Sequence, residues 1–388
     1  SDRPMMKYLP GLLKQKLKHW TGRKWYHQRF DGSPYLLHLI AEAEIVTYTE
    51  RKQGGEFTVH YCFFEDGKAD WYIEMQDIKR VYTSIIDAGK RDKNISKTLL
   101  QQWKKDEEIF SRKCQEIENA DLSNLSNEEI IKLHDDFVQI ILNRNSSSSL
   151  IDGFALGTDE LIAAEIKKVY DQSKLKENMK FTEAFSILTA PIHLSFINDA
   201  EVELLKIAVE VQKKPQKRKQ LIQDHQLKFF WIRNNYVSAH VLSVEYFNEE
   251  LNKILALNVD IENEIKKIEK THILNKKKKK ELLQKLILPE ELKLLLTISE
   301  DFTYWQDARK KATFWIAHYC TLLLDEMGKR VKIPADELKY MSPREVSSIF
   351  IHAPDRKILR ERRKNSVFYW DKEGHDALSG KDADKVKK

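Results

Sequence analysis

The sequence predicts a mainly α-helical protein, in which a helical bundle carries a small N-terminal α+β portion and a short C-terminal β-hairpin. Of the 388 residues, 41% are hydrophobic and 32% are charged, as expected for long helices with one face in the core and one in solvent. Only 12 glycines and 9 prolines interrupt the chain, which disfavours an all-β fold. From about Asn94 onward, apolar residues recur at helical spacing.

A chain of this length can bury a sizeable core, so we expect two or three packed units. Residues 1–93 should form the small α+β portion with its hairpin, and residues 94–350 the body of the helical bundle. Residues 351–388 should form the C-terminal hairpin and a linker.

The N-terminal portion should begin with a basic helix over Lys14–Trp25. Two runs rich in β-branched and aromatic residues, Phe57–Phe64 and Ala69–Met75, lie on either side of Asp66-Gly67. Asp-Gly favours the left-handed backbone of a two-residue hairpin turn, so the two runs are predicted to pair as strands.

The helices of the bundle have several sequence markers. Ser126-Asn127-Glu128-Glu129 is a capping box, in which the Ser side chain accepts from the Glu129 amide and the Glu reaches back. Asn143–Ser149 is polar and serine-rich, so a loop is expected there. The lysine-rich stretch Ile261–Leu288 is predicted to be an antiparallel helical pair that projects into solvent. Further helices are predicted over Thr158–Tyr170, Ala200–Gln212, Lys219–Leu257 with a break near Asn234-Asn235, and Glu290–Arg330.

The C-terminal region contains a second capping box, Ser342-Pro343-Arg344-Glu345. Its proline occupies the first helical position, where the missing N–H costs nothing. A hairpin is expected next, with strands Ser366–Trp370 and His375–Leu378 joined across Asp371–Gly374.

Composition and charge disfavour two classes of partner. The net charge is +6, and much of the basic excess lies in Lys213–Lys219 and Lys276–Lys280. Nucleic-acid binding needs aromatic side chains between the basic ones as stacking platforms, and neither run has any, so nucleic acid is not expected as a partner. No run of 18 apolar residues occurs, so no membrane-spanning helix is expected.

The ends and cysteines of the chain bear on where the protein works. Ser1–Pro4 has neither an initiator Met nor the apolar core of a signal peptide, which indicates a trimmed end. Cys62, Cys114 and Cys320 lie far apart without paired spacing. That pattern favours buried thiols in a reducing cytoplasm.

Familiar catalytic motifs do not occur in the sequence. It lacks a P-loop, a Rossmann glycine fingerprint, a G-x-S-x-G elbow and the ligand spacing of a zinc site. No catalytic residue, metal ligand or cofactor is therefore predicted within this chain.

Two clusters of aromatic and polar residues are candidates for a substrate cleft, one within His225–Tyr236 and one within Tyr304–Tyr319. Aromatic area with a few convergent polar groups would suit substrate binding, and plain core packing of the same residues is the alternative. Arg309 follows Trp305 by four residues on an apolar stripe, so it either reaches the wet edge or meets an anion. The candidate substrate-binding residues are His225, Trp231, Asn235, Tyr236, Tyr304, Trp305, Arg309 and His318.

The order of elements near the C-terminus resembles a known enzyme family. A long helix that ends in Asp325-Glu326-Met327-Gly328-Lys329-Arg330 precedes the Ser342 capping box, Arg360-Glu361-Arg362-Arg363-Lys364 and the hairpin. Ile187–Phe196 and Glu201–Ala208 add hydrophobic signatures. Over residues 95–388 the chain resembles the helical middle of phosphoenolpyruvate-utilising phosphotransferases, the phosphoenolpyruvate synthase and rifampicin phosphotransferase group, just before their swivelling phosphohistidine domain.

The resemblance implies partners that this chain does not contain. In such enzymes an ATP-grasp domain phosphorylates a histidine on the swivelling domain, which carries the phosphate to a second site. ATP and Mg are implied only for those missing domains, because residues 1–90 are too short for a complete ATP-grasp fold. His60 follows Gly54-Gly55, but Lys52 and Val59 stand where the family motif T-x-G-G-x-x-S-H has its threonine and histidine. No catalytic residue is therefore carried over.

Two functions are compatible with the sequence. The first is the substrate-binding or connecting region of a phosphoenolpyruvate synthase-like phosphotransferase, not catalytic alone, with a small acceptor or anion near Arg309, His225 and His318. The second is a non-enzymatic helical scaffold that uses Ile261–Leu288 as a charged arm for a protein or nucleic-acid partner.

Overall fold

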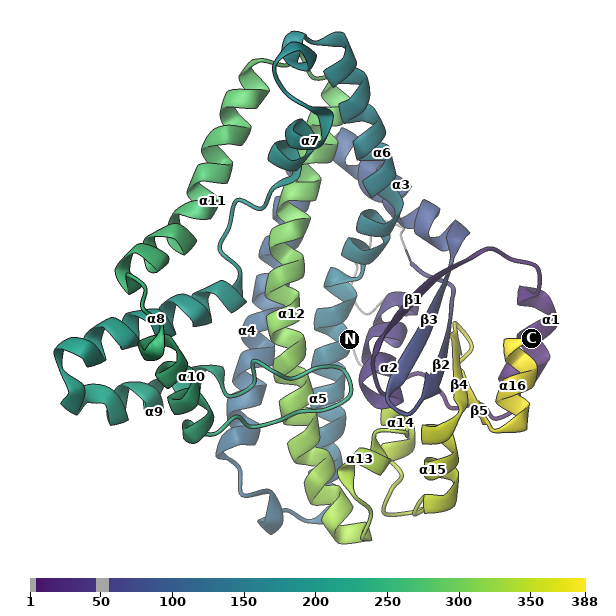
Figure 1. The fold of residues 1–388 in the computed structure, drawn as a ribbon. Coiled ribbons are helices and arrows are strands. Elements are labelled where there is room, and N and C mark those ends of the chain that lie inside the picture. Colours follow the sequence, from purple (N-terminus) through teal and green to yellow (C-terminus); the bar gives the residue numbers. More distant parts are fainter. Residues whose placement is uncertain (1–4, 47–55) are drawn as a thin grey trace. The chain divides into compact units, whose positions relative to one another are not determined.

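The computed structural model describes residues 5–46 and 56–388, and within them helices dominate (Figure 1). The mainly α-helical class is therefore confirmed. Two compact units are present. The sheet unit comprises Ser1–Gly157, Asn235–Ser238 and Trp315–Lys388, and the helical unit comprises Thr158–Asn234 and Ala239–Phe314.

The predicted N-terminal hairpin is present. Strands β2 (Val59–Glu65) and β3 (Lys68–Glu74) pair antiparallel across Asp66 and Gly67. Both turn residues have positive φ, 46° and 83°, which is the conformation that a type I′ turn requires. Strand β1 (Trp25–Asp31) pairs with the other edge of β3.

The basic helix predicted over Lys14–Trp25 is wrong in its last part, because strand β1 begins at Trp25. The helix α1 spans only Leu12–Trp20. Gly22 then adopts a φ of 82°, a backbone conformation that L side chains rarely adopt, and the chain turns into the strand. Trp25 is consequently the first residue of β1 and not the last residue of the helix.

The C-terminal hairpin is also present, and it completes the sheet. Strands β4 (Ser366–Asp371) and β5 (His375–Ser379) pair with each other, and β4 pairs with β2 in a register that places Val59 opposite Asp371. The described strands form one antiparallel sheet of order β1-β3-β2-β4-β5. Residues 351–388 thus join the same compact unit as residues 1–93, a grouping that differs from the boundaries drawn at 93 and 350.

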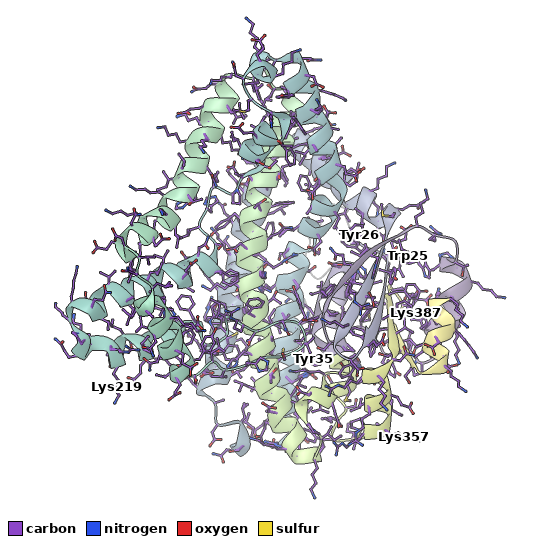
Figure 2. All side chains as sticks on the ribbon, in the orientation of Figure 1. Trp25, Tyr26, Tyr35, Lys219, Lys357 and Lys387 are labelled. Carbon is purple, nitrogen blue, oxygen red and sulfur yellow. The ribbon has the colours of Figure 1, made fainter. Side chains whose placement is uncertain are left out.

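Helix α2 (Pro34–Ile45) lies between the sheet and the long helices of the sheet unit. Every residue of α2 except Ile40 is buried, and the helix contacts β2 and β4 as well as α5 (Asn127–Ser148). Tyr35, labelled in Figure 2, faces α5, where its hydroxyl lies 2.7 Å from His134 Nε2. The helices that lie wholly in this unit are α1, α2 (Pro34–Ile45), α3 (Met75–Arg91), α4 (Ile95–Asn119), α5 (Asn127–Ser148), α13 (Ala335–Leu338), α14 (Pro343–Val346), α15 (Arg356–Lys364) and α16 (Lys381–Lys387).

The loop predicted over Asn143–Ser149 is wrong. Helix α5 continues to Ser148, and α6 (Leu150–Gln172) follows after Ser149, whose own φ and ψ are helical. Serine hydroxyls within a helix can bond the carbonyl one turn earlier. Ser148 Oγ donates to Asn145 O and Ser149 Oγ to Ser146 O, so the polar side chains are satisfied without leaving the helix.

Both capping boxes are confirmed. Ser126 Oγ accepts from the Glu129 N–H at 3.1 Å, and Ser342 Oγ accepts from the Glu345 N–H at 3.2 Å. In each box the glutamate accepts from the backbone N–H of the serine in return. The first box starts α5 and the second starts α14.

The helical unit is built from five short and medium helices together with parts of α6 and α12 (Glu290–Val331). The helix predicted over Lys219–Leu257 is interrupted: α9 (Arg218–Phe229) ends before Asn234, and α10 (Val244–Ala256) begins after it. Asn234 Oδ1 accepts from His240 N at 2.8 Å, and its Nδ2 donates to Phe314 O at 3.0 Å. The five helices are α7 (Phe181–Thr189), α8 (Phe196–Lys213), α9 (Arg218–Phe229), α10 (Val244–Ala256) and α11 (Ile261–Gln284).

The antiparallel helical pair predicted over Ile261–Leu288 is wrong, because α11 is one continuous helix of 24 residues. It contains neither glycine nor proline, and it packs on α8 and α7. Its inward residues recur at alternating steps of four and three, at Ile261, Ile265, Ile268, His272, Asn275, Lys279 and Leu282. Helix α12 confirms the prediction made for Glu290–Arg330.

Truncation of Phe368 should destabilise the sheet unit strongly. The ring is fully buried on β4 and lies edge to face with Phe64 of β2, with centroids 5.5 Å apart. Phe368→Ala should lower the free energy of unfolding by about 3–5 kcal/mol in urea titrations. The exposed Ile351→Ala is the control, expected within about 0.5 kcal/mol of wild type. A loss for Phe368→Ala as small as the control's would contradict this packing.

Candidate functional site

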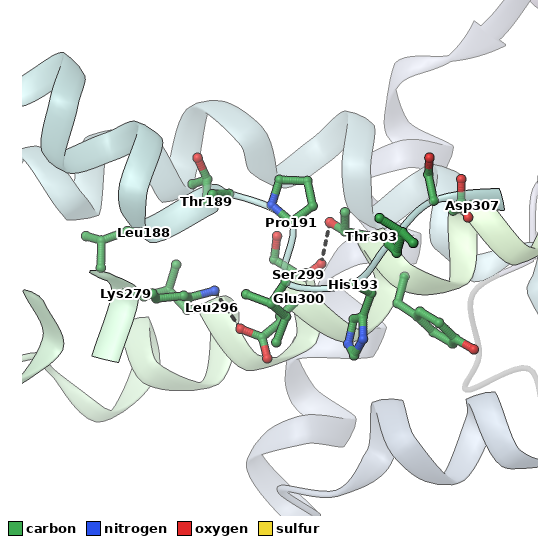
Figure 3. Close-up of a pocket in the computed structure, with 15 residues that line it drawn as sticks. Leu188, Thr189, Pro191, His193, Lys279, Leu296, Ser299, Glu300, Thr303 and Asp307 are labelled. Carbon is green, nitrogen blue, oxygen red and sulfur yellow. Dashed lines mark hydrogen bonds and ion pairs between the residues drawn. The ribbon is translucent and has the colours of Figure 1, made fainter. Parts of the chain in front are cut away.

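A small cavity of about 170 Å³ lies in the helical unit, between the segment that joins α7 to α8 and the helices α11 and α12 (Figure 3). Its walls are apolar at Leu188, Ile192, Leu194 and Leu296. Polar groups enter from all three elements: His193 from the joining segment, Lys279 from α11, and Ser299, Glu300, Tyr304 and Asp307 from α12. Apolar walls with a few convergent polar groups are typical of small-molecule sites.

The joining segment is extended because of its proline. Backbone sterics keep the residue before a proline out of the helical region, and Ala190 has φ −63° and ψ 141°. Helix α7 therefore ends at Thr189. Helix α8 starts again at Phe196, where Ser195 Oγ accepts from Asn198 N at 3.1 Å.

Hydrogen bonds fix the segment at both ends. Asn275 Nδ2 of α11 donates to Pro191 O at 3.1 Å. At the other end, Phe196 N donates to Asp307 Oδ2 of α12 at 3.0 Å. Between them the ring of His193 packs against Tyr304, with centroids 4.8 Å apart. The cavity therefore has a defined wall on the side of this segment.

Lys279 and Glu300 form an ion pair at the cavity, with Nζ and Oε2 2.6 Å apart (Figure 3). The Lys279 side chain is only 10% exposed and that of Glu300 is 32% exposed. The four other residues of the run Lys276–Lys280 are exposed. A buried lysine requires a partner, and Glu300 supplies it.

Asp307 adds a second carboxylate to the wall. Burial raises the pKa of Asp307, the Phe196 N–H opposes this rise, and nearby Asp199 adds to it. The side chain therefore holds a proton more readily than an exposed aspartate. It is suited to accept a hydrogen bond or a proton from a hydroxyl group in the cavity.

In the first predicted cluster, His225 and Trp231 are core residues of the helical unit. His225 Nδ1 lies 3.2 Å from Glu203 Oε1, and its ring packs against Phe229 and Phe247. Burial lowers the pKa of His225. Trp231 is also buried, and its Nε1 donates to Lys228 O at 2.7 Å.

Asn235 and Tyr236 belong to the sheet unit. Asn235 Oδ1 accepts from the backbone N–H groups of Val237 and Ser238, both at 2.9 Å. Tyr236 O accepts from Ser33 N at 2.9 Å. Both residues organise a turn, and the four residues of this cluster are divided between two units.

Of the second cluster, Tyr304 lines the cavity. Trp305 is fully buried, with its ring 5.6 Å from that of Phe302 in an edge-to-face contact. Arg309 is partly buried on the same helix and lies outside the cavity lining, as does Trp305.

His318 belongs to the sheet unit. It is buried, its Nε2 lies 4.0 Å from Glu118 Oε2, and burial lowers its pKa to about 4. His225, Arg309 and His318, which were expected near one ligand, do not line the cavity.

The cavity residues that the sequence did not single out are His193, Lys279, Glu300 and Asp307. The spacing of Lys279 from Ile265 and His272 could have identified it, because it continues the inward face of α11 through a run of lysines. His193 lies two residues after Pro191, in the segment between the end of α7 and the start of α8. For Glu300 and Asp307 we find no comparable pattern.

His60 is buried on β2, and its Nε2 lies 2.6 Å from Glu44 Oε2. A phosphate could reach it only if the core opened. Lys52 and Gly54-Gly55, which precede it in the sequence, lie outside the described residues.

Within residues 5–46 and 56–388, no group of three or more His, Cys, Asp or Glu side chains is arranged to hold a metal ion. Over the same ranges, no helix is both long and apolar enough to cross a membrane.

Comparison with known proteins gives no match: the sequence fits no family model and no curated protein, and the structure fits no solved structure.

Replacement of Lys279 should cost more than replacement of its neighbour. Lys279→Met keeps the length of the side chain but leaves Glu300 without its ammonium partner. We expect a loss of about 1–2 kcal/mol in unfolding free energy, measured by urea titration. Lys278→Met, at an exposed position of the same run, should change it by less than about 0.5 kcal/mol. Equal effects of the two variants would contradict the buried pair.

His318 should contribute to acid sensitivity. Its folded pKa of about 4 lies below the ordinary value of about 6.5, so the unfolded chain binds more protons between these values. Stability should therefore be unaffected by this group above about pH 6.5 and fall as the pH drops towards 4, by roughly 2–3 kcal/mol. His318→Phe should remove this part of the acid limb in urea titrations at several pH values. An unchanged acid limb would count against the assignment.

Proposed function

We propose that this chain is the acceptor-binding and connecting region of a phosphoenolpyruvate synthase-like phosphotransferase. In this proposal the cavity holds a small acceptor, and domains outside this chain supply the rest. An ATP-binding domain with its Mg would phosphorylate a swivelling domain on histidine, and that domain would bring the phosphoryl group to the acceptor. The observation that carries the proposal is the cavity with its apolar walls and ordered polar groups.

The size of the cavity supports a small acceptor. An engineered cavity of about 150 Å³ in another protein holds one benzene molecule. The volume here is about 170 Å³. The acceptor would therefore be a small metabolite, and a molecule of the size of an antibiotic such as rifampicin would not fit.

The charges of the lining support a neutral or cationic acceptor. Two carboxylates, Glu300 and Asp307, face the cavity with one ammonium group, that of Lys279. An anionic ligand would meet two carboxylates and one ammonium group in a partly buried site, where charges interact more strongly than in water, and would be repelled. A small molecule with a hydroxyl or amino group would instead donate to these oxygens.

The residues of the cavity would divide the work of holding such an acceptor. Leu188, Ile192 and Leu296 would cover its apolar part and exclude water. Asp307 would accept the proton of the reacting hydroxyl, because its raised pKa brings it closer to neutral pH. The Lys279–Glu300 pair would orient the acceptor without reacting.

The alternative of a helical scaffold keeps less support. It uses Ile261–Leu288 as a free charged arm, and α11 packs on α8 and α7 along most of that stretch.

We also propose the cytoplasm as the compartment, because Cys62, Cys114 and Cys320 are all buried free thiols.

Calorimetric titration with small hydroxylated and aminated metabolites tests the binding step. At least one such compound should bind, and Ser299→Phe should weaken that binding at least tenfold because the larger ring fills the cavity. Ser299→Ala is the matched control and should bind within about twofold of wild type. A panel without any ligand, or a ligand insensitive to Ser299→Phe, would contradict the site.

Phosphoryl transfer can then be tested by phosphorus NMR. A swivelling domain phosphorylated on histidine is mixed with the acceptor that binds, with and without this chain. The phosphorylated acceptor should form only when the chain is present. Binding without transfer would retain the acceptor site and reject the phosphotransferase assignment.

A further inference from the structure

A second concave site lies in the sheet unit, and it shares no lining residue with the acceptor cavity. It is a groove of about 330 Å³ between α1, α16 and the outer face of strands β1, β2 and β3. Five aromatic side chains line it: Trp20, Trp25, Tyr61, Phe63 and Tyr72. Figure 2 shows Trp25 and Lys387, two lining residues, at this edge of the sheet.

The sheet register brings these rings together from distant parts of the sequence. Side chains two residues apart on a strand point to the same face, so Tyr61 and Phe63 share one face of β2. Tyr61 pairs with Tyr72 of β3, and Tyr72 pairs in turn with His27 of β1, two residues after Trp25. Trp20 joins them from the end of α1.

The rings are held in place but remain accessible. Trp25 meets Tyr61 edge to face at 5.3 Å, and Trp20 meets Trp25 edge to face at 6.2 Å. Trp20 Nε1 also donates to the hydroxyl of Tyr369 at 2.8 Å, which fixes the indole. Trp20, Trp25, Phe63 and Tyr72 are nevertheless only partly buried. A group of large, partly exposed aromatic rings on one surface is a feature of binding sites.

The charged residues that line the groove are Arg23, Lys387 and Lys388, and all are basic. The Arg23 guanidinium lies 5.3 Å from the ring centre of Trp20, and Lys387 Nζ lies 5.9 Å from that of Phe63. Asp70, which neighbours Tyr72 on the same face, is paired with His27 and Arg29. The groove therefore places aromatic rings and positive charge side by side. One face of Tyr72 is covered by the ring of His27, which stacks on it at 4.7 Å, so a ligand would use the other face.

We infer that this groove binds a nucleotide, with the planar base against the aromatic rings and the phosphate near Arg23 and Lys387. Stacking of bases on aromatic side chains beside basic residues is the general means by which proteins hold single nucleotides or strands without sequence preference. The volume lies at the lower end of the range for small-ligand sites, which suits one nucleotide. The two basic runs of the sequence, Lys213–Lys219 and Lys276–Lys280, do not line the groove. Its residues come from separate parts of the sequence and are brought together by the fold. The inference does not rest on the proposed phosphotransferase function.

Titration calorimetry on the full chain tests the inference, with AMP as the first probe. AMP should bind with a stoichiometry of one and more weakly at high salt. Adenosine and inorganic phosphate should each bind at least tenfold more weakly, because each lacks half of the recognised chemistry. Phosphate as tight as AMP, or no AMP binding at millimolar concentration, would overturn the inference.

Variants separate the groove from general electrostatics. Arg23→Glu with Lys387→Glu should weaken AMP at least tenfold, and both positions are exposed, so folding should be retained. The control is the double variant Lys219→Glu and Lys357→Glu, which makes the same change of net charge at two exposed lysines outside the groove. It should bind AMP within about twofold of wild type. Equal losses in the two double variants would overturn the inference.

The role of the aromatic rings of the groove is tested separately. Tyr72→Ala should weaken AMP at least fivefold and leave the binding of inorganic phosphate unchanged, with a thermal melt to confirm that the variant is folded. An unchanged affinity for AMP would overturn the stacking role.

A short single-stranded oligoribonucleotide is the last probe. If it binds at least tenfold tighter than AMP and competes with it, the nucleotide recognised by the groove is part of a strand. If it does not, the nucleotide is a free mononucleotide.

Discussion

The antiparallel pairing of β2 with β4 is the constraint on which the sheet unit depends. It joins Val59–Glu65 to Ser366–Asp371, segments from opposite ends of the chain. Once β4 is in place, the hairpin residue Asp376 accepts from the backbone N–H groups of Gly11 and Leu13, both at 3.0 Å. The aromatic groove follows from the same sheet. Strand β2 supplies its central rings, and Lys387 at the end of α16 and Lys388 after it follow the hairpin in the chain.

Short sequence signals were sufficient to predict many helix starts and both hairpins. They were not sufficient to predict which strands from distant parts of the chain pair with each other. Asp66-Gly67 and the Ser126 and Ser342 boxes act within four residues, so their structures follow from a short window of sequence. The β2–β4 pairing has no such local marker. The Asn143–Ser149 error has a related cause: the serines indicated a loop, but carbonyls one turn earlier accept their hydroxyl groups and the helix continues.

The candidate site was harder to predict than the fold. Aromatic clusters such as His225–Tyr236 attract attention in a sequence, yet His225 and Trp231 are packed in the core, and their burial serves stability. The cavity uses Lys279, an unremarkable member of a lysine run whose burial arises only when α11 packs on α7 and α8. A sequence pattern locates the face of a helix, whereas a cavity depends on which other segments approach that face.

The acceptor site is tested most directly by a crystal structure of this chain with a small metabolite whose binding, measured by titration, is weakened by Ser299→Phe. We expect the ligand between the segment of residues 190–195 and α12, with a hydroxyl or amino group in contact with Glu300 or Asp307. A ligand bound elsewhere on the chain, or a cavity closed by the side chains of its own walls, would contradict the proposed site.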